Sequence, residues 1–209
     1  RYSLFIVLAL ILLLWIFRDR KSDGYRQGSQ LIAASKYEPA IAAFDRVIQL
    51  EPNHAEAWYL RGYACLQLGK YQDAISSYNQ ALEIKPEYAE AWHDKGSVLR
   101  SLHSHEEAIA CYEKAIELQP DFSLAWYNRG LTLQDLQRYE QAIASYDKAI
   151  ELQPKYPEAW MHRGDTLALL QRDDEAIEAY QQAMAMQPNS LAWLKQVKKL
   201  EKLQRYAEA

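Results

Sequence analysis

Several residue types recur along the sequence at one fixed interval, the interval from Pro52 to Pro86. This repeat step constrains the fold more than any other feature. Prolines recur at that step, at Pro52, Pro86, Pro120, Pro154 and Pro188. Glycines recur at Gly28, Gly62, Gly96, Gly130 and Gly164. Tryptophans recur at Trp58, Trp92, Trp126 and Trp160. Chance does not place several such columns in register, so the chain is built from repeats of one structural unit.

Two further columns indicate how the unit packs. Small residues recur at Ala40, Ala74, Ala108, Ala142 and Ala176. An aromatic residue recurs at Phe44, Tyr78, Tyr112, Tyr146 and Tyr180. Glycine and alanine allow two helices to approach closely, the aromatic ring fills the space between them, and proline ends the second helix. The spacing of Asn53 and Glu56 predicts a capping pair at the start of a first helix.

The pattern resembles that of the tetratricopeptide repeat family. The family sequence is W-x2-L-G-x2-Y, then A-x3-F, A and P, and its period matches the step seen here. The second repeat carries Trp58, Gly62, Ala74, Tyr78 and Pro86 at those places. The chain departs from the family in the leucine column before glycine, which holds Arg61, Lys95, Arg129 and Arg163.

The resemblance implies an all-α fold, a right-handed superhelical solenoid of antiparallel helix pairs. Five repeats fit residues 22–190, with predicted bounds at 21–54, 55–88, 89–122, 123–156 and 157–190. The first repeat is weaker, because Gly24 stands where the others have tryptophan. Residues 191–209 have helical spacing and predict a capping helix or a shortened sixth repeat.

Residues 2–17 form a separate, uncharged and strongly apolar segment. As a helix the segment would be roughly 24 Å long, slightly short of a ~30 Å hydrocarbon core. The segment has no small-residue cleavage site and no polar face, which argues against a signal peptide and a buried core helix. We therefore expect residues 1–21 to be a single-pass transmembrane anchor with a basic flank. Arg18, Arg20 and Lys21 favour a cytoplasmic side for the repeats.

Composition and motifs argue against catalysis. The formal net charge is −4, which argues against nucleic acid as a partner. The glycines are spread one per repeat, so we expect no phosphate-binding loop and no cofactor. Cys65 and Cys111 are expected to be buried thiols. His103 and His105 lie in an expected turn without further ligands at metal spacing, so we expect no metal site and no enzyme activity.

The resemblance implies a concave surface lined by the first helix of each repeat, where a protein or peptide partner would bind. The candidate groove residues are Tyr25, Tyr59, Tyr63, His93, Asp94, Tyr127, Asn128, Met161 and Asp165. These residues are aromatic and mildly acidic, so the partner segment should be apolar or basic. The column lacks the lysines with which co-chaperones of this family hold a terminal carboxylate, and the sequence leaves the oligomeric state open.

The predicted function is therefore that of a membrane-tethered adaptor or assembly factor that binds a partner protein. The main alternative is a regulatory or targeting segment of a larger enzyme, such as a glycosyltransferase or kinase. The reading frame beyond Ala209 would discriminate between the two, because only the second continues into a catalytic domain.

Overall fold

The computed structural model describes residues 23–187, 198–199 and 201–202. The predicted anchor at 2–17 and Pro188 lie outside these residues, as does most of the predicted cap at 191–209. Regular secondary structure in the described part of the chain is helical throughout. No helix formed by these residues is both long and apolar enough to cross a membrane.

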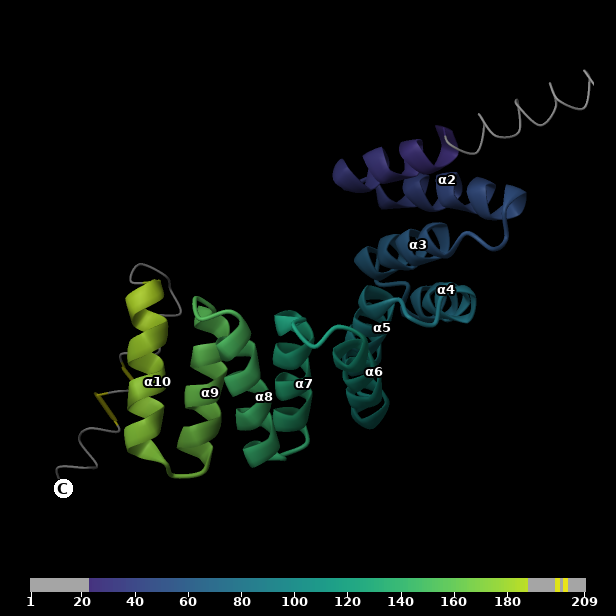
Figure 1. Cartoon of the computed structure of the whole chain (residues 1–209). Helices are drawn as coiled ribbons and strands as arrows, with labels where there is room; N and C mark the ends of the chain where they lie inside the picture. The colour runs from purple at the N-terminus through teal and green to yellow at the C-terminus, as the bar shows by residue number, and fades with distance from the viewer. Residues whose placement is uncertain (1–22, 188–197, 200, 203–209) are drawn as a thin grey trace, which may run out of the picture. The chain divides into compact units, whose positions relative to one another are not determined.

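The helices follow one another along the chain and are joined by short connections (Figure 1). A helix over residues 23–33 precedes the labelled helices. They are α2 (Tyr37–Leu50), α3 (Ala55–Gln67), α4 (Tyr71–Ile84), α5 (Ala89–Ser101), α6 (His105–Leu118), α7 (Ser123–Asp135), α8 (Tyr139–Leu152), α9 (Pro157–Leu169) and α10 (Asp173–Met186). Short turns join each first helix to its second, which makes antiparallel pairs.

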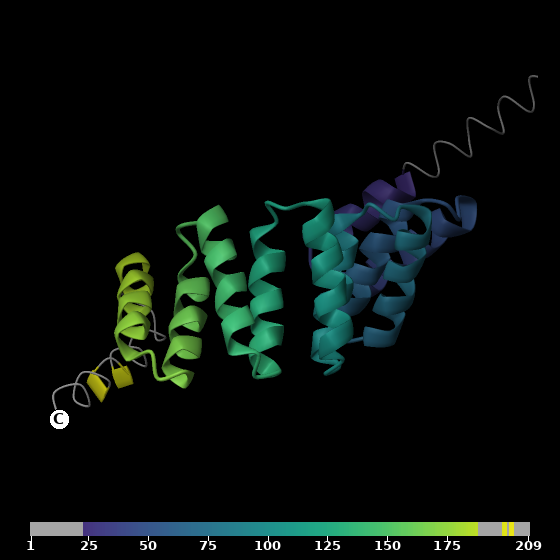
Figure 2. The ribbon, with the colours of Figure 1, turned by 60° about the horizontal axis from the view of Figure 1, so that its bottom comes forward.

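The chain divides into two compact units, and the division falls within α5. Unit 1 spans Arg1–Val98 and contains α2, α3 and α4, with α3 packed on both of the others. Unit 2 spans Leu99–Ala209, and in it α7, α8, α9 and α10 pack in chain order, side by side in Figure 2. Each unit is described by itself below.

Glycine and aromatic columns meet in the core of both units. The side chains of Phe44, Tyr78, Tyr146 and Tyr180 are fully buried, and burial of such a ring contributes about 1.5–3 kcal/mol. A Cβ atom added at Gly62 would lie 2.7 Å from Tyr78 Cε1. At Gly130 it would lie 2.5 Å from Tyr146 Cε1. The glycines are therefore required because the rings occupy the space where a side chain would begin.

A turn in the left-handed region follows each first helix. The five residues there have φ between 56° and 70°, and they are Ser35, Gly69, His103, Gln137 and Gln171. Two backbone hydrogen bonds close each turn; in the second repeat, Gly69 N donates to Leu66 O and Lys70 N to Cys65 O. This pairing satisfies the last carbonyls of the helix. The position also recurs at the repeat step, although only Gly69 is a glycine.

The tryptophan and proline columns are joined by hydrogen bonds. Trp58 Nε1 donates to Pro52 O at 2.8 Å, and Trp92 Nε1 donates to Pro86 O at the same distance. The equivalent bonds of unit 2 start from Trp126 and Trp160 and reach Pro120 and Pro154 at 3.1 and 3.3 Å. Each indole therefore fixes the turn that leads into its own helix.

Arginines that replace the family leucine connect neighbouring repeats. Arg61 Nε donates to Asp45 Oδ1 at 2.7 Å, and Arg61 Nη1 donates to Ser77 Oγ at 2.6 Å. In unit 2, Arg129 makes the same contacts with Glu113 and Ser145, at 2.8 and 2.7 Å. Each guanidinium also lies over the tryptophan of its own helix, at 5.9 Å for Arg61. The departure from the family pattern thus replaces an apolar contact by a charged one.

The start of α3 differs from the prediction. The N-terminal cap is His54, whose Nδ1 accepts a hydrogen bond from Ala57 N at 3.3 Å. The predicted pair of Asn53 and Glu56 does not form this cap. The helix begins one residue later than the spacing indicated, so the capping position passes to histidine.

Candidate binding site

The candidate groove residues lie on first helices in both units. Unit 1 holds Tyr25, Tyr59, Tyr63, His93 and Asp94, and unit 2 holds Tyr127, Asn128, Met161 and Asp165. All of them are partly exposed except His93, which is 6% exposed. His93 Nδ1 lies 2.8 Å from Asp94 Oδ1, so the structure places this histidine in the packing of unit 1.

Tyr59 forms a ring pair with Tyr88, the residue before α5. The ring centroids lie 4.9 Å apart with an interplanar angle of 43°. The Tyr59 hydroxyl donates to Asp94 Oδ2 at 2.9 Å. Burial, and then the Asp94 charge, raise the pKa of Tyr59 well above its ordinary value. The hydroxyl therefore stays protonated and serves as a donor at physiological pH.

A lysine of the protein itself stands over this pair. Lys85 Nζ lies 4.6 Å from the centroid of the Tyr88 ring and 3.6 Å from Glu56 Oε1. A backbone hydrogen bond holds the pKa of Glu56 below its ordinary value, and Lys85 and His54 add to this effect. The ammonium group is thus held between an aromatic face and a carboxylate.

Unit 2 contains an equivalent ring pair, Tyr127 with Tyr156. Its centroids lie 4.9 Å apart at an angle of 41°, and His162 lies 5.8 Å from Tyr127. Burial, and then the Glu158 charge, raise the pKa of Tyr127 to about 12. Burial lowers the pKa of His162, so this imidazole is neutral at pH 7.

Polar groups deeper in unit 2 are already engaged. Gln134 Oε1 accepts hydrogen bonds from Tyr146 Oη at 2.8 Å and from Thr166 Oγ1 at 3.1 Å. Asp165, a predicted groove residue, accepts a hydrogen bond from Tyr180 Oη at 2.8 Å. Asp165 also forms an ion pair with Lys199. Its carboxylate therefore has internal partners.

Sequence reasoning missed the second ring of each pair. The missed residues form their own column at the repeat step, and they are His54, Tyr88, Phe122 and Tyr156. His54 stacks on Tyr25 with centroids 5.1 Å apart and an interplanar angle of 16°, so the first repeat also has a ring pair at these positions. The column itself was the available signal, since tyrosine or phenylalanine fills three of its four positions.

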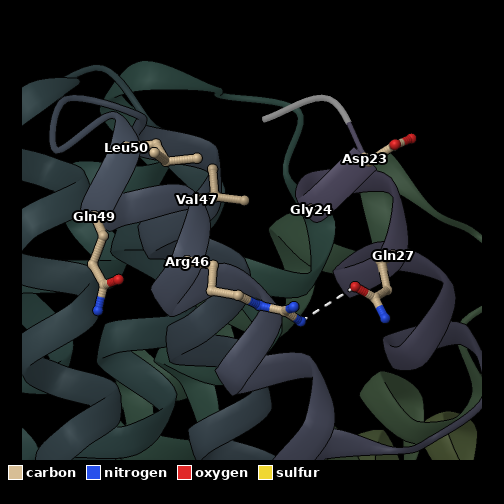
Figure 3. Close-up of a pocket in the computed structure, with 7 residues that line it drawn as sticks. All are labelled: Asp23, Gly24, Gln27, Arg46, Val47, Gln49 and Leu50. Carbon is tan, nitrogen blue, oxygen red and sulfur yellow. Dashed lines mark hydrogen bonds between the residues drawn. The ribbon is translucent and has the colours of Figure 1, made fainter. Parts of the chain in front are cut away.

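A separate pocket lies beside the first helix of unit 1 (Figure 3). Its volume is about 420 Å³, and its lining includes Gly24 and Val47. Gly24 takes the place of the column tryptophan, and Val47 takes the place of the alanine found in later repeats. Arg46 Nη2 donates to Gln27 Oε1 at 3.2 Å beside the pocket. The pocket therefore opens where the first repeat lacks its indole.

Thiols and clustered polar side chains are the groups that could support catalysis or hold a metal. Cys65 and Cys111 are buried, as predicted, and burial raises the pKa of Cys65. In residues 23–187 and the described residues beyond them, no group of three or more His, Cys, Asp or Glu side chains is placed to hold a metal ion. The ring pairs are thus the strongest candidate for a functional site.

The class of protein that this geometry defines is an all-α protein of stacked helix pairs that carries ring pairs on its first helices. The tetratricopeptide repeat family matches residues 25–89, 93–157 and 129–191. The chain belongs to the tetratricopeptide repeat family. No significant relative was found among curated proteins.

Solved structures of similar fold agree with this assignment. The crystal structure of MamA is 25% identical, covers 77% of this chain and 94% of its own, and has a TM-score of 0.73. YrrB, described as a TPR protein with an unusual peptide-binding site, is 23% identical, covers 84% and 90%, and has a TM-score of 0.71. PilF of Pseudomonas aeruginosa is 18% identical, covers 92% and 87%, and has a TM-score of 0.80.

Proposed function

We propose that this protein is a non-enzymatic scaffold that binds a partner protein or peptide through the ring pairs of its first helices. The observation that carries the proposal is the recurrence of one partly exposed pair, Tyr59 with Tyr88 and Tyr127 with Tyr156, at the same 4.9 Å separation. Tyrosine brings a large contact area and a hydroxyl at low entropic cost. Repeat proteins bind through extended surfaces of this kind, which supports the assignment.

A photo-crosslinking experiment tests the binding surface. A photoreactive amino acid is placed at Leu124, which is exposed on α7, and at Ala144, which is exposed on α8. We expect crosslinking to one partner from position 124 and not from 144. In the same assay Tyr127→Ala should weaken capture about ten-fold, since aromatic contacts contribute about 1–2 kcal/mol. Equal capture from both positions would overturn the assignment.

Lysines near the C-terminal end provide the contrast. Lys198 and Lys202 are exposed, and we expect Lys198→Ala and Lys202→Ala to change partner capture by less than about two-fold. If these variants fail while the tyrosine variants bind normally, the basic end is the binding site.

We further propose that residues 2–17 tether the scaffold to a membrane as a single-pass anchor, with the repeats on the cytoplasmic side. The proposal rests on the uncharged apolar run and on the cluster of Arg18, Arg20 and Lys21. Retention in the membrane pellet after alkaline extraction tests the anchor. A reporter fused at residue 209 tests the orientation, and a signal from the far side of the membrane would contradict it.

A further inference from the structure

The two ring pairs differ in whether the protein supplies its own cation. In unit 1 the ammonium of Lys85 stands over the Tyr88 ring at 4.6 Å and is balanced by Glu56 at 3.6 Å. Unit 1 therefore shows, within the molecule, which chemical group this pair of rings accepts. A cation held against an aromatic face and a carboxylate is a favourable arrangement for lysine or arginine.

The same position in unit 2 holds no cation. The residue equivalent to Lys85 is Gln153, whose Oε1 accepts a hydrogen bond from Ser123 Oγ at 3.2 Å. The residue equivalent to Glu56 is Leu124, which is 41% exposed. Among the tyrosines of the described residues, lysines stand over the rings of Tyr88 and Tyr180, and none stands over Tyr156. The outer face of the second pair is thus left to an external group.

Charges around the second pair favour a cation. Glu158 is exposed, and after burial its charge adds to the raised pKa of the Tyr127 and Tyr156 hydroxyls. Arg100, whose charge opposes the rise in the Tyr127 pKa, is paired with Asp135 at 3.0 Å. His162 is neutral at pH 7 because burial lowers its pKa. Lys155 precedes Tyr156 in the chain and is exposed.

We infer that Tyr127, Tyr156 and Glu158 form a subsite for a lysine or arginine side chain of the partner. The rings receive the cationic head, Glu158 supplies the balancing charge, and exposed Leu124 contacts the aliphatic stem. The inference rests on the proposed scaffold function, and it specifies which side chain of the partner the surface recognises.

The test uses the full chain in mild detergent, with 3-fluorotyrosine in place of tyrosine. The probe is acetyl-Gly-Lys-Gly-amide, and the control is the same peptide with norleucine, which has a similar stem and no charge. We expect the fluorine signals of Tyr127 and Tyr156, identified with Tyr→Phe variants, to shift and saturate with the lysine peptide. The norleucine peptide should bind roughly two- to five-fold more weakly. Equal shifts with both peptides would overturn the inference.

Exchange of the two equivalent residues sharpens the test. Gln153→Lys should supply an internal cation and weaken the lysine peptide at Tyr156 at least two-fold. Gln119→Lys, at the same position of the preceding repeat, is the matched control and should leave the Tyr156 signal unchanged. Lys85→Gln should free the Tyr88 ring, so that the fluorine signal of Tyr88 also shifts as the lysine peptide is added. If Gln153→Lys binds the peptide as the unmodified chain does, the subsite is wrong.

The outcomes separate the subsite from the scaffold function. Loss of the lysine preference with intact crosslinking from Leu124 would overturn only the subsite. A retained lysine preference without any partner crosslinking would overturn the scaffold function and leave the subsite standing.

Discussion

Units 1 and 2 share the buried ring of each repeat and differ in what the hydroxyl of that ring contacts. Tyr78 and Tyr146 are both fully buried against a glycine of the preceding helix. The Tyr146 hydroxyl donates to Gln134 at 2.8 Å, whereas the Tyr78 hydroxyl is buried without a hydrogen-bond partner in the described structure. The residue equivalent to Gln134 in unit 1 is Leu66. The position of the buried ring is therefore the same in both units, while the hydrogen-bond partner of its hydroxyl differs between them.

The surface shows the same division. The ring pairs have equal centroid separations, but Lys85 covers the pair in unit 1 and Gln153 stands at that position in unit 2. The comparison teaches that residues kept from repeat to repeat specify the packing. Positions where the residue changes from repeat to repeat specify the chemistry of the surface. Binding specificity should therefore be sought where the two units differ.

The largest expected effect tests the shared packing. Gly62→Leu and Gly130→Leu should each lower the free energy of unfolding by about 1–3 kcal/mol, since fully buried rings occupy the required space. Urea denaturation of the full chain in detergent, followed by circular dichroism, measures this. Gly24→Leu should cost less, because a Cβ atom at Gly24 would lie 3.0 Å from Val47 Cγ2, beside the pocket, and not against a buried ring. Unchanged urea midpoints for Gly62→Leu and Gly130→Leu would show that the buried rings move aside at little cost in free energy.

The next effect tests the difference between the buried hydroxyls. Tyr146→Phe should destabilise the chain by about 1 kcal/mol, because a hydrogen bond to Gln134 is lost. Tyr78→Phe should be neutral or stabilising, since it removes a buried hydroxyl that has no partner in the described structure. The same denaturation measurement applies. An equal loss in both variants would mean that the two hydroxyls are equally satisfied, and this part of the comparison would fail.

A smaller effect concerns the turns after the first helices. Gln137 adopts a φ of 60°, which is unfavourable for a residue with a Cβ atom, whereas unit 1 has Gly69 at the equivalent turn. We expect Gln137→Gly to stabilise the chain by at most about 1 kcal/mol and Gly69→Ala to destabilise it by a similar amount. Thermal unfolding of both variants checks the signs. Destabilisation by Gln137→Gly would show that its side chain contributes more than the backbone strain costs.

Much of the fold could be predicted because its determinants recur in register. The repeat step indicated the helix pairs, the glycine contacts and the buried rings, since each of these depends on residues at fixed spacing. The left-handed turn at Gly69 also recurs at the repeat step. Serine, histidine and glutamine fill the other positions, so the residue types did not predict a left-handed backbone there. The predicted cap at Asn53 was wrong by one residue because local spacing alone does not fix a helix start.

The candidate site was predicted only in part. The tyrosines of the first helices were found from their column, while Tyr88 and Tyr156 were missed because their contacts depend on how the next turn folds back. Sequence also could not show that His93 is buried or that Asp165 is paired with Lys199. These properties arise from packing between helices and not from position within one helix. The anchor at 2–17 and the groove role of the candidate residues stay predictions.

The smallest expected effect is a pH dependence of the free energy of unfolding that arises from His162. The second repeat has no titratable residue at the equivalent position. Burial lowers the pKa of His162 below its ordinary value near 6.5, while the second repeat carries Leu60 there. The neutral imidazole is favoured in the folded state, so its contribution to stability is present above the unfolded pKa and is lost as pH falls through the folded pKa. The unmodified chain should therefore lose more stability between pH 7 and pH 5 than His162→Leu does. Urea denaturation at the two pH values measures the difference, and Asn128→Leu, at the same position of the preceding repeat, is the control that should follow the unmodified chain. Parallel losses in the unmodified chain and His162→Leu would mean that other groups carry the pH dependence.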